Sequence, residues 1–116
     1  MKEKFRVKKH QEFQEIINSK NFEKNSFYAI YFRSNSYSYS RIGISASKKL
    51  GNAVKRVKIR RQVRAMLCEL WGLDIPLDLV IIVRNGYKIE NYNESLKRLK
   101  ELLDKILWRI KKKKKG

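Results

Sequence analysis

The segment that most constrains the fold of this 116-residue chain is Lys48–Arg64, in which eight of 17 residues are lysine or arginine and none is acidic. Like charges three and four residues apart repel one another along a helix, so a helix of this composition needs solvent or a polyanion on its charged side. No acid occurs between Glu23 and Glu69, an interval that holds eleven cations. We therefore expect one strongly positive side on the folded protein, and RNA is the first candidate partner.

The excess charge belongs to the body of the chain and not only to its end. Lysine and arginine number 29 against 11 acids, a formal net charge of +18, and 24 cations remain when Lys111–Lys115 is set aside. With 42% apolar and 11% aromatic residues, the chain can build one domain around one core. We expect a single RNA-binding domain over residues 1–110 and a basic tail over residues 111–116, which adds nonspecific attraction.

The composition argues against several classes of protein. A lone cysteine, Cys68, excludes an internal disulfide, and a lone histidine, His10, argues against a His/Cys metal site. No apolar run approaches the roughly 20 residues of a membrane span, and the first residues lack the apolar region of a secretion signal. We expect a cytoplasmic protein without a membrane partner, with no catalytic and no metal-ligating residues of its own.

The first half of the chain predicts one helix and two or three strands. Lys9–Ser19 has apolar residues at helical spacing, and Phe27–Arg33 is aromatic and β-branched enough for a strand. A further short strand is expected at Phe22. The polar segment Ser34–Ser40 is expected to close a hairpin with Arg41–Ser47, whose alternation puts small polar side chains on one face.

The second half predicts a strand between two helices. Asn52 is expected to cap a helix over Ala53–Trp71 that Gly72 ends, with a core stripe of Ile59, Val63, Met66, Leu67 and Leu70. Leu77–Arg84 is the most hydrophobic segment and is typical of a central strand. A last helix follows Asn91 or Asn93. The order is αβββαβα, an α+β fold with a single four-stranded sheet and three helices.

The residues favour binding over catalysis. The acids are scattered, which favours structural roles, whereas arginine and lysine attract phosphates and the rings of Phe13 and Tyr31 can stack on unpaired bases. Two alternatives for this surface stay open. The ring of Phe13 is about equally well explained as docked on the core or as partly exposed in a groove. The small polar face of Arg41–Ser47 is about equally well explained as an ordinary solvated face or as room for a bulky ligand against the sheet.

Other function classes fit the pattern less well. A merely solvated charged helix does not explain the missing acids, and a membrane-surface helix would need the apolar stripe that the core requires. A basic RNA-binding structural protein, such as a ribosomal protein or an RNA chaperone, is the main alternative. A protein enzyme acting alone has almost no support among the residues.

The segment RIGISASKKLGNAVKRVKIRRQVRAML, Arg41–Leu67, closely resembles the signature of the protein subunit of bacterial ribonuclease P. The resemblance extends upstream through RVKKHQEFQEII and downstream through the last helix. It implies a left-handed βαβ crossover, shared with a domain of a small-subunit ribosomal protein and with domain IV of elongation factor G. It also implies that the chain partners a catalytic RNA, which removes the 5′ leader of precursor tRNA with Mg²⁺ ions bound mainly by the RNA, without an obligate protein partner.

The resemblance also assigns two sets of residues. The surface facing the catalytic RNA is Lys48, Lys49, Asn52, Arg56, Lys58, Arg60, Arg61 and Arg64, and the track for the precursor tRNA leader is Lys9, Phe13, Tyr31, Ser45 and Ser47. The chain departs from the family in two places. Val57 stands where an asparagine is usual, and Ile17 stands where an aromatic residue is common, which shortens the stacking surface.

Overall fold

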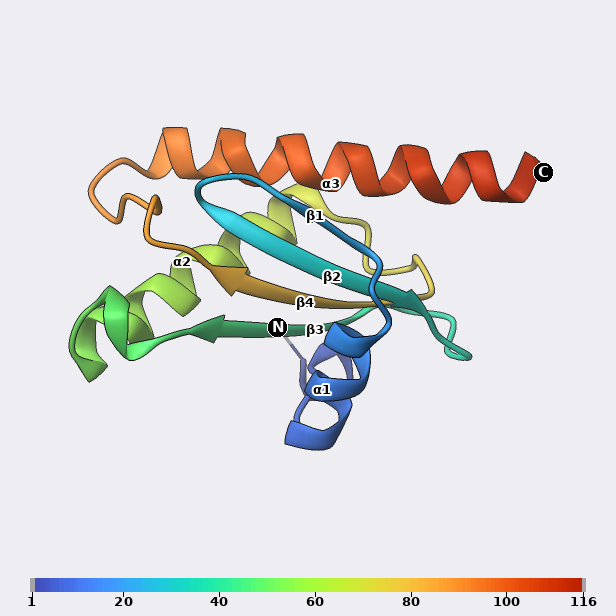
Figure 1. Cartoon of the computed structure of the whole chain (residues 1–116), viewed down its shortest axis with the longest axis horizontal. Helices are drawn as coiled ribbons and strands as arrows, with labels where there is room; N and C mark the ends of the chain where they lie inside the picture. The colour runs from blue at the N-terminus through green and yellow to red at the C-terminus, as the bar shows by residue number, and fades with distance from the viewer. Residues whose placement is uncertain (1, 116) are drawn as a thin grey trace.

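The computed structural model describes residues 2–115, with side chains through Lys112. It confirms the predicted α+β fold of one four-stranded sheet and three helices (Figure 1). The elements are α1 (His10–Asn18), β1 (Phe22–Lys24), β2 (Tyr28–Ser34), β3 (Arg41–Ala46), α2 (Ala53–Leu70), β4 (Leu77–Val83) and α3 (Tyr92–Lys115), with the short 3₁₀ turns η1 (Glu3–Phe5) and η2 (Lys48–Leu50).

Strand β4 lies inside the sheet, as its hydrophobicity predicts. The strand order is β1-β2-β4-β3, with β4 antiparallel to β2 and parallel to β3. The predicted hairpin at Ser34–Ser40 is therefore wrong, because β4 separates the two strands that this loop joins. A strand that is apolar on both faces needs cover on both, so it takes the inner position.

The connection β3–α2–β4 joins two parallel neighbours through a helix. In Figure 1 both strands point left, β4 lies above β3, and α2 passes behind the sheet. This is the left-handed sense that the family resemblance implies, whereas such connections are nearly always right-handed. Helix α2 begins shortly after β3, which lies at the edge of the sheet, and the predicted interface residues lie at this junction and along the helix.

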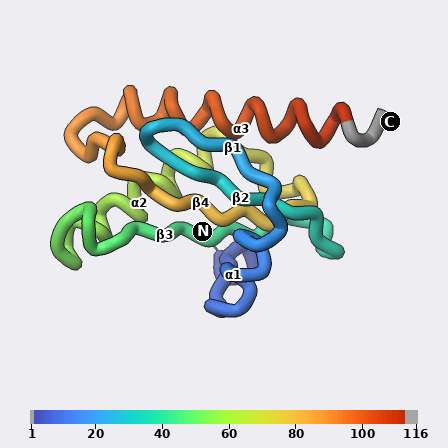
Figure 2. The backbone as a smooth tube through the Cα atoms, in the orientation of Figure 1, coloured from blue at the N-terminus to red at the C-terminus, as the bar shows by residue number. Residues whose placement is uncertain are grey.

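The three helices cover the two faces of the sheet unequally. Helices α2 and α3 pack on one face and bury the main core, and α1 packs on the other face over a small cluster formed by Val7, Ile16 and Val80 (Figures 1 and 2). At the centre of the main core the buried hydroxyl of Tyr28 donates to the carbonyl of Ser95 at 2.8 Å. The face of the sheet on which α1 packs is therefore less fully covered than the face on which α2 and α3 pack.

The helix ends agree only partly with prediction. The expected core stripe of α2 is confirmed, with four of its five residues buried and Leu70 packed against them. The helix ends at Leu70, however, and Trp71 is extended and buried, so Gly72 does not provide the expected stop. The basic tail that we set apart at residues 111–116 begins inside α3, which continues to Lys115; Gly116 lies outside the described residues.

A buried carboxylate ties α1 to the sheet. Asp78 of β4 accepts two hydrogen bonds from the guanidinium of Arg41, at 3.0 Å and 2.8 Å, and one from Arg33 at 3.2 Å. The same two guanidinium groups also pair with acids of α1. Arg41 pairs with Glu12 at 2.7 Å, and Arg33 pairs with Glu15 at 3.3 Å. The acids thus have the structural role that we predict for them, although Asp78 is buried and not on a solvent face.

Burial raises the pKa of Asp78, but hydrogen bonds from Arg41, Asn35 and Arg33 outweigh burial and hold the pKa below its ordinary value. The carboxylate is therefore ionised at neutral pH and the ion pairs persist. Two of the eleven cations between Glu23 and Glu69 are consequently neutralised within the fold. The remaining cations carry the positive surface.

Candidate RNA interface

Helix α2 begins with the cap that the sequence predicts. Gly51 has a backbone φ of +136°, which residues with side chains rarely adopt, and it turns the chain into the helix. The Oδ1 atom of Asn52 accepts a hydrogen bond from the backbone N–H of Lys55 at 2.9 Å. Turn η2 holds Lys48 and Lys49 exposed just before this helix N-terminus, whose free N–H groups favour a phosphate.

The outward side of α2 combines charge with exposed apolar surface. Lys58 and Arg61 are exposed there, beside Val54 and Val57, which are 80% and 38% exposed. Together with Ala53 these residues line a shallow hollow. Val57 thus presents an exposed methyl surface beside Lys58 and Arg61.

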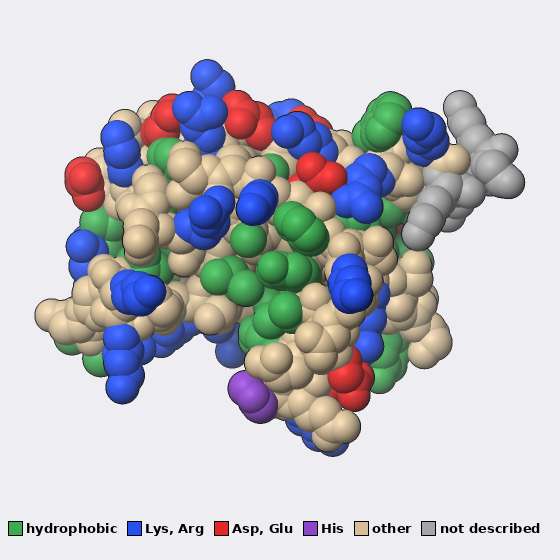
Figure 3. Space-filling model, in the orientation of Figure 1, with side chains coloured by type: hydrophobic (Ala, Val, Ile, Leu, Met, Phe, Trp, Pro, Cys, Tyr) green, Lys and Arg blue, Asp and Glu red, His purple; other side chains and the backbone are tan. Residues whose placement is uncertain are grey.

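The inward side of α2 borders a cleft of about 490 Å³. Arg60 and Arg64, one helical turn apart, form one wall, β3 forms the floor, and the N-terminal segment with the start of α1 forms the other wall. None of the lining residues is acidic. They are Arg6, Val7, Lys8, His10, Phe13, Ile42, Gly43, Ile44, Ser45, Ala46, Arg60 and Arg64. In Figure 3 the surface is hollowed between the single histidine (purple) and the end of the molecule where α2 begins.

The ring of Phe13 lies directly on the floor of this cleft. A Cβ atom at Gly43 would come within 2.8 Å of Cε1 and 3.0 Å of Cε2 of that ring, so only glycine leaves room for it. Phe13 is half-buried, so its ring is partly docked on the core and partly available to a ligand. One side packs on the sheet and the remaining surface lines the cleft.

Strand register shows which other residues share this floor. Gly43 is opposite Val80, which is opposite Tyr31, and Ser45 is opposite Ile82. Because side chains alternate along a strand, these residues belong to one face of the sheet. Hydrophobic side chains gather on this side of the molecule in Figure 3, over β2 and β4.

The predicted leader residues are only partly brought together. Phe13 and Ser45 line the cleft, whereas Tyr31 lies on the same sheet face two strands away, with its ring centroid 5.3 Å from that of Phe22. Lys9 is exposed just before α1, and Ser47 is exposed just after β3. Neither of these two residues belongs to the cleft lining.

The predicted RNA-facing residues also divide into two groups. Arg60 and Arg64 line the cleft beside the leader residues, while Arg56 is half-buried one turn earlier. The other five, Lys48, Lys49, Asn52, Lys58 and Arg61, are exposed on η2 and on the outer side of α2. The helix therefore contributes to two neighbouring surfaces.

The N-terminal segment is the part of the site that sequence reasoning missed. The backbone N–H of Val7 donates to the carbonyl of Ile42 at 2.9 Å and extends the outer edge of β3. This pairing brings Arg6, Lys8 and His10 to the cleft. The alternation of cations around Val7 is the only signal in the sequence, and it is too short to predict strand pairing.

Three guanidinium groups in the cleft are close enough to influence one another. The pKa of Arg64 is lowered, first by burial and then by the charges of Arg6 and Arg60. Among residues 2–112 the buried Nε atoms of Arg6 and Arg56 have no hydrogen-bond partner. An anion in the cleft would relieve the repulsion among Arg6, Arg60 and Arg64, so the cleft is chemically suited to the phosphates of a nucleic acid strand.

The part of the chain that the structure describes holds no group of three His, Cys, Asp or Glu residues suited to a metal ion. No helix within residues 2–115 is long and apolar enough to cross a membrane.

Comparison with known proteins identifies relatives along nearly the whole chain. The sequence model of the family Ribonuclease P matches residues 1–107. The ribonuclease P protein component of Mesoplasma florum is 42% identical over 109 residues, which cover 92% of this chain and 99% of that protein. The corresponding protein of Streptococcus gordonii is 38% identical over 89% of this chain and 87% of its own length.

Solved structures agree with this assignment. The ribonuclease P protein of Staphylococcus aureus is 32% identical with a TM-score of 0.79, covering 86% of this chain and 93% of that one. The protein of Thermotoga maritima is 26% identical with a TM-score of 0.76, covering 86% and 96%. The fold, the cleft beside a cationic helix and the sequence matches lead to one conclusion: the chain belongs to the family of ribonuclease P protein components.

Proposed function

We propose that the cleft between α1, β3 and α2 holds the single-stranded 5′ leader of precursor tRNA, while η2 and the outer side of α2 dock the catalytic RNA. The chain is the protein component of ribonuclease P, the ribonucleoprotein endonuclease of tRNA 5′ processing, and it associates with the ribonuclease P RNA. In this enzyme the RNA subunit is catalytic and the protein is accessory. The proposal concerns how this protein divides its surface between the two RNAs.

The observation that carries the proposal is the meeting of Phe13, Arg60 and Arg64 in one acid-free cleft. The exposed part of the ring offers a base a stacking surface, and the two arginines offer its phosphates charge-assisted hydrogen bonds. Ser45 adds a short polar side chain that leaves the floor accessible. These contacts suit an unpaired strand better than a duplex, because a paired base cannot stack on a protein ring.

The outer surface has a different chemistry. Lys58 and Arg61 project from an apolar hollow, and Lys48 and Lys49 flank the N-terminus of α2. These exposed cations fit the closely spaced phosphates of a structured RNA, where binding depends on counterion release. We propose that Mg²⁺ ions act in this complex and are bound mainly by the RNA.

Two further expectations belong to the proposal. We expect the enzyme to work where tRNA precursors are made, in the cytoplasm, and to need no other protein. We propose precursor tRNA as the substrate. The cleft lies beside the helix that is proposed to dock the catalytic RNA, so a leader strand held in the cleft can reach that RNA.

The test is reconstitution with a bacterial ribonuclease P RNA at low Mg²⁺ concentration. We expect the wild-type protein to stimulate cleavage of precursor tRNA and the Phe13→Ala variant to stimulate it less. The matched control is Tyr37→Ala, which removes an exposed ring that does not line the cleft. Equal stimulation by the Phe13→Ala protein and the wild type would overturn the assignment of the cleft.

A further inference from the structure

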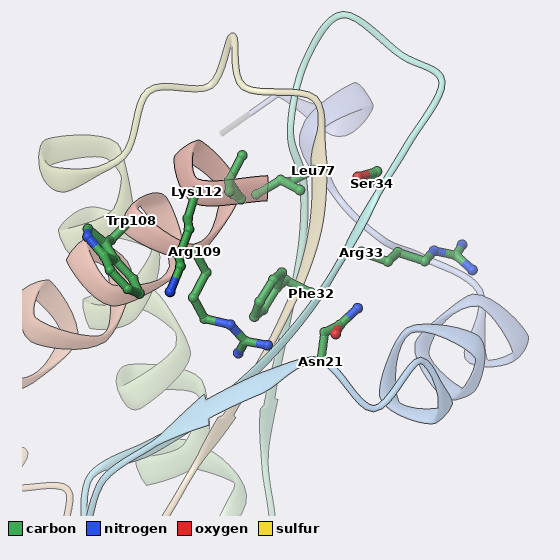
Figure 4. Close-up of a pocket in the computed structure, with 9 residues that line it drawn as sticks. Asn21, Phe32, Arg33, Ser34, Leu77, Trp108, Arg109 and Lys112 are labelled. Atoms are coloured by element: carbon green, nitrogen blue, oxygen red, sulfur yellow. The ribbon is translucent and has the colours of Figure 1, made fainter. Parts of the chain in front are cut away.

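A third hollow in the described residues lies at the C-terminal half of α3 and shares no lining residue with the cleft or with the hollow on α2. It has a volume of about 570 Å³, and Asn21, Phe32, Leu77, Trp108, Arg109 and Lys112 are among its lining residues (Figure 4). In Figure 1 this part of α3 lies at the right end of the molecule, whereas α2 begins at the left end. The surface proposed for the catalytic RNA therefore does not extend to this hollow.

One wall of the hollow is held rigidly by Arg109. Its guanidinium lies 5.0 Å from the ring centroid of Phe32, and its Nη1 atom donates to the carbonyl of Phe22 at 3.0 Å and to Glu23 at 2.9 Å. Phe32 is only 6% exposed. Because the charge of Arg109 is already compensated by Glu23, this residue shapes the hollow and is not counted among its free cations.

Trp108 provides a large aromatic surface that the fold does not use. Its side chain is 62% exposed, although an indole ring contributes most when it is buried. The Nζ atom of Lys112 lies 4.9 Å from the centroid of this ring, and in Figure 4 the lysine points between Trp108 and Arg109. The fold therefore presents an exposed ring and a cation together.

Further cations surround this ring. Lys105 and Lys111 lie three residues before and after Trp108 on α3, so they are neighbours of it on the helix surface. The ion pairs among the described side chains include neither of these lysines nor Lys112. The nearby Asp104 is paired with Lys100 at 2.8 Å.

We propose that this hollow is a further RNA-binding site, which holds an unpaired nucleotide with its base stacked on Trp108 and its phosphate against Lys112. Lys105 and Lys111, which lie beside the hollow on α3, attract the neighbouring phosphates of the strand. Base–aromatic stacking and phosphate–lysine attraction are the combination by which proteins bind single strands. A lipid surface fits less well, because the apolar stripe of α3, including Leu99, Leu102 and Ile106, is buried in the core. An acidic peptide would satisfy the lysines but would leave the ring without a partner.

Tryptophan fluorescence of the full chain tests this site directly. The chain has two tryptophans, and Trp71 is only 4% exposed, so an RNA strand that quenches emission at the hollow acts on Trp108. The Trp108→Phe variant is the matched control, because it keeps an aromatic ring and reports on Trp71 alone. The probes are a ten-nucleotide single-stranded RNA and a duplex of the same sequence.

We expect the single strand to quench the wild-type protein and leave the emission of the Trp108→Phe variant unchanged. Lys112→Gln should shift the quenching midpoint to about threefold to tenfold higher RNA concentration, since it removes one charged contact. Equal quenching by the duplex would overturn the proposal, as would unchanged emission at RNA concentrations that saturate binding by anisotropy. Precursor cleavage is not the readout, so failure here leaves the assignment of the cleft intact.

Discussion

The contact between Phe13 and Gly43 predicts a strong coupling between these two residues. A methyl group at Gly43 would overlap the Phe13 ring. We expect Gly43→Ala to lower the free energy of unfolding by about 1–3 kcal/mol, the usual cost of overpacking. Gly43 has no positive φ, so its backbone conformation is open to alanine.

The sign of this effect should change when the ring is absent. In a Phe13→Ala background the three atoms nearest to the added methyl group are removed, and replacing glycine by alanine should then stabilise by about 0.4–1 kcal/mol through the unfolded chain. The double-mutant cycle should therefore show a coupling of about 1.5–4 kcal/mol. Urea unfolding of the wild type, both single variants and the double variant measures all four corners.

The same cycle has a functional counterpart. Gly43→Ala should displace the ring from the cleft and weaken binding of precursor tRNA, within the roughly 1–3 kcal/mol that stacking of one base contributes. Binding of mature tRNA, which lacks the leader, should stay the same. If the two substitutions are additive in the unfolding free energy, the ring does not occupy the position described here and the reasoning is refuted.

Three other variants test separate parts of the account. Arg61→Ala should reduce the salt dependence of binding to the catalytic RNA by roughly one ion without changing stability, and an unchanged slope would mean that Arg61 faces away from the RNA. Asn52→Ala should cost about 0.5–2 kcal/mol of stability by removing the cap, whereas Asn52→Asp should keep the cap and weaken only RNA binding. Equal stability of the wild type, Asn52→Ala and Asn52→Asp would contradict the role of the cap. Asp78→Asn should cost about 3–5 kcal/mol, because it breaks a buried ion pair, while Asp104→Asn at an exposed pair should cost under about 1 kcal/mol.

The low pKa of Asp78 also sets a pH dependence. The folded-state pKa lies below the unfolded value of about 3.9, so the stability from this carboxylate is fully present above that pH and is lost as pH falls through the folded-state pKa. Urea unfolding from pH 7 to pH 2 should show this loss in the wild type. A variant with Asp78→Asn should show a shallower decline, and parallel curves would contradict the network.

The helices and the central strand could be predicted from the sequence because their signals are local. The stripes of α2 and α3, the cap at Asn52 and the apolar run of β4 each follow from spacing within one segment. The family resemblance supplied the handedness of the crossover, which no local pattern encodes.

The errors concern contacts between distant segments. The Ser34–Ser40 loop has the polar composition of a hairpin turn, yet β4, more than 35 residues later in the sequence, lies between β2 and β3. The positive residues Arg33 and Arg41 are counted as surface charge by composition alone, but Asp78, together with Glu15 and Glu12, neutralises them in the fold. Likewise Arg6 reaches the cleft only because Val7 pairs with the edge of β3.

The central claim, that one helix serves two RNA surfaces, is tested most directly by comparing Arg64→Ala with Arg61→Ala. Each protein is assembled with the catalytic RNA, and the dissociation constants for precursor and mature tRNA are measured under conditions of full assembly. The account predicts that Arg64→Ala weakens binding of precursor tRNA alone, whereas Arg61→Ala weakens assembly with the catalytic RNA and leaves the preference for precursor intact. A loss of that preference in Arg61→Ala, together with its retention in Arg64→Ala, would contradict the account.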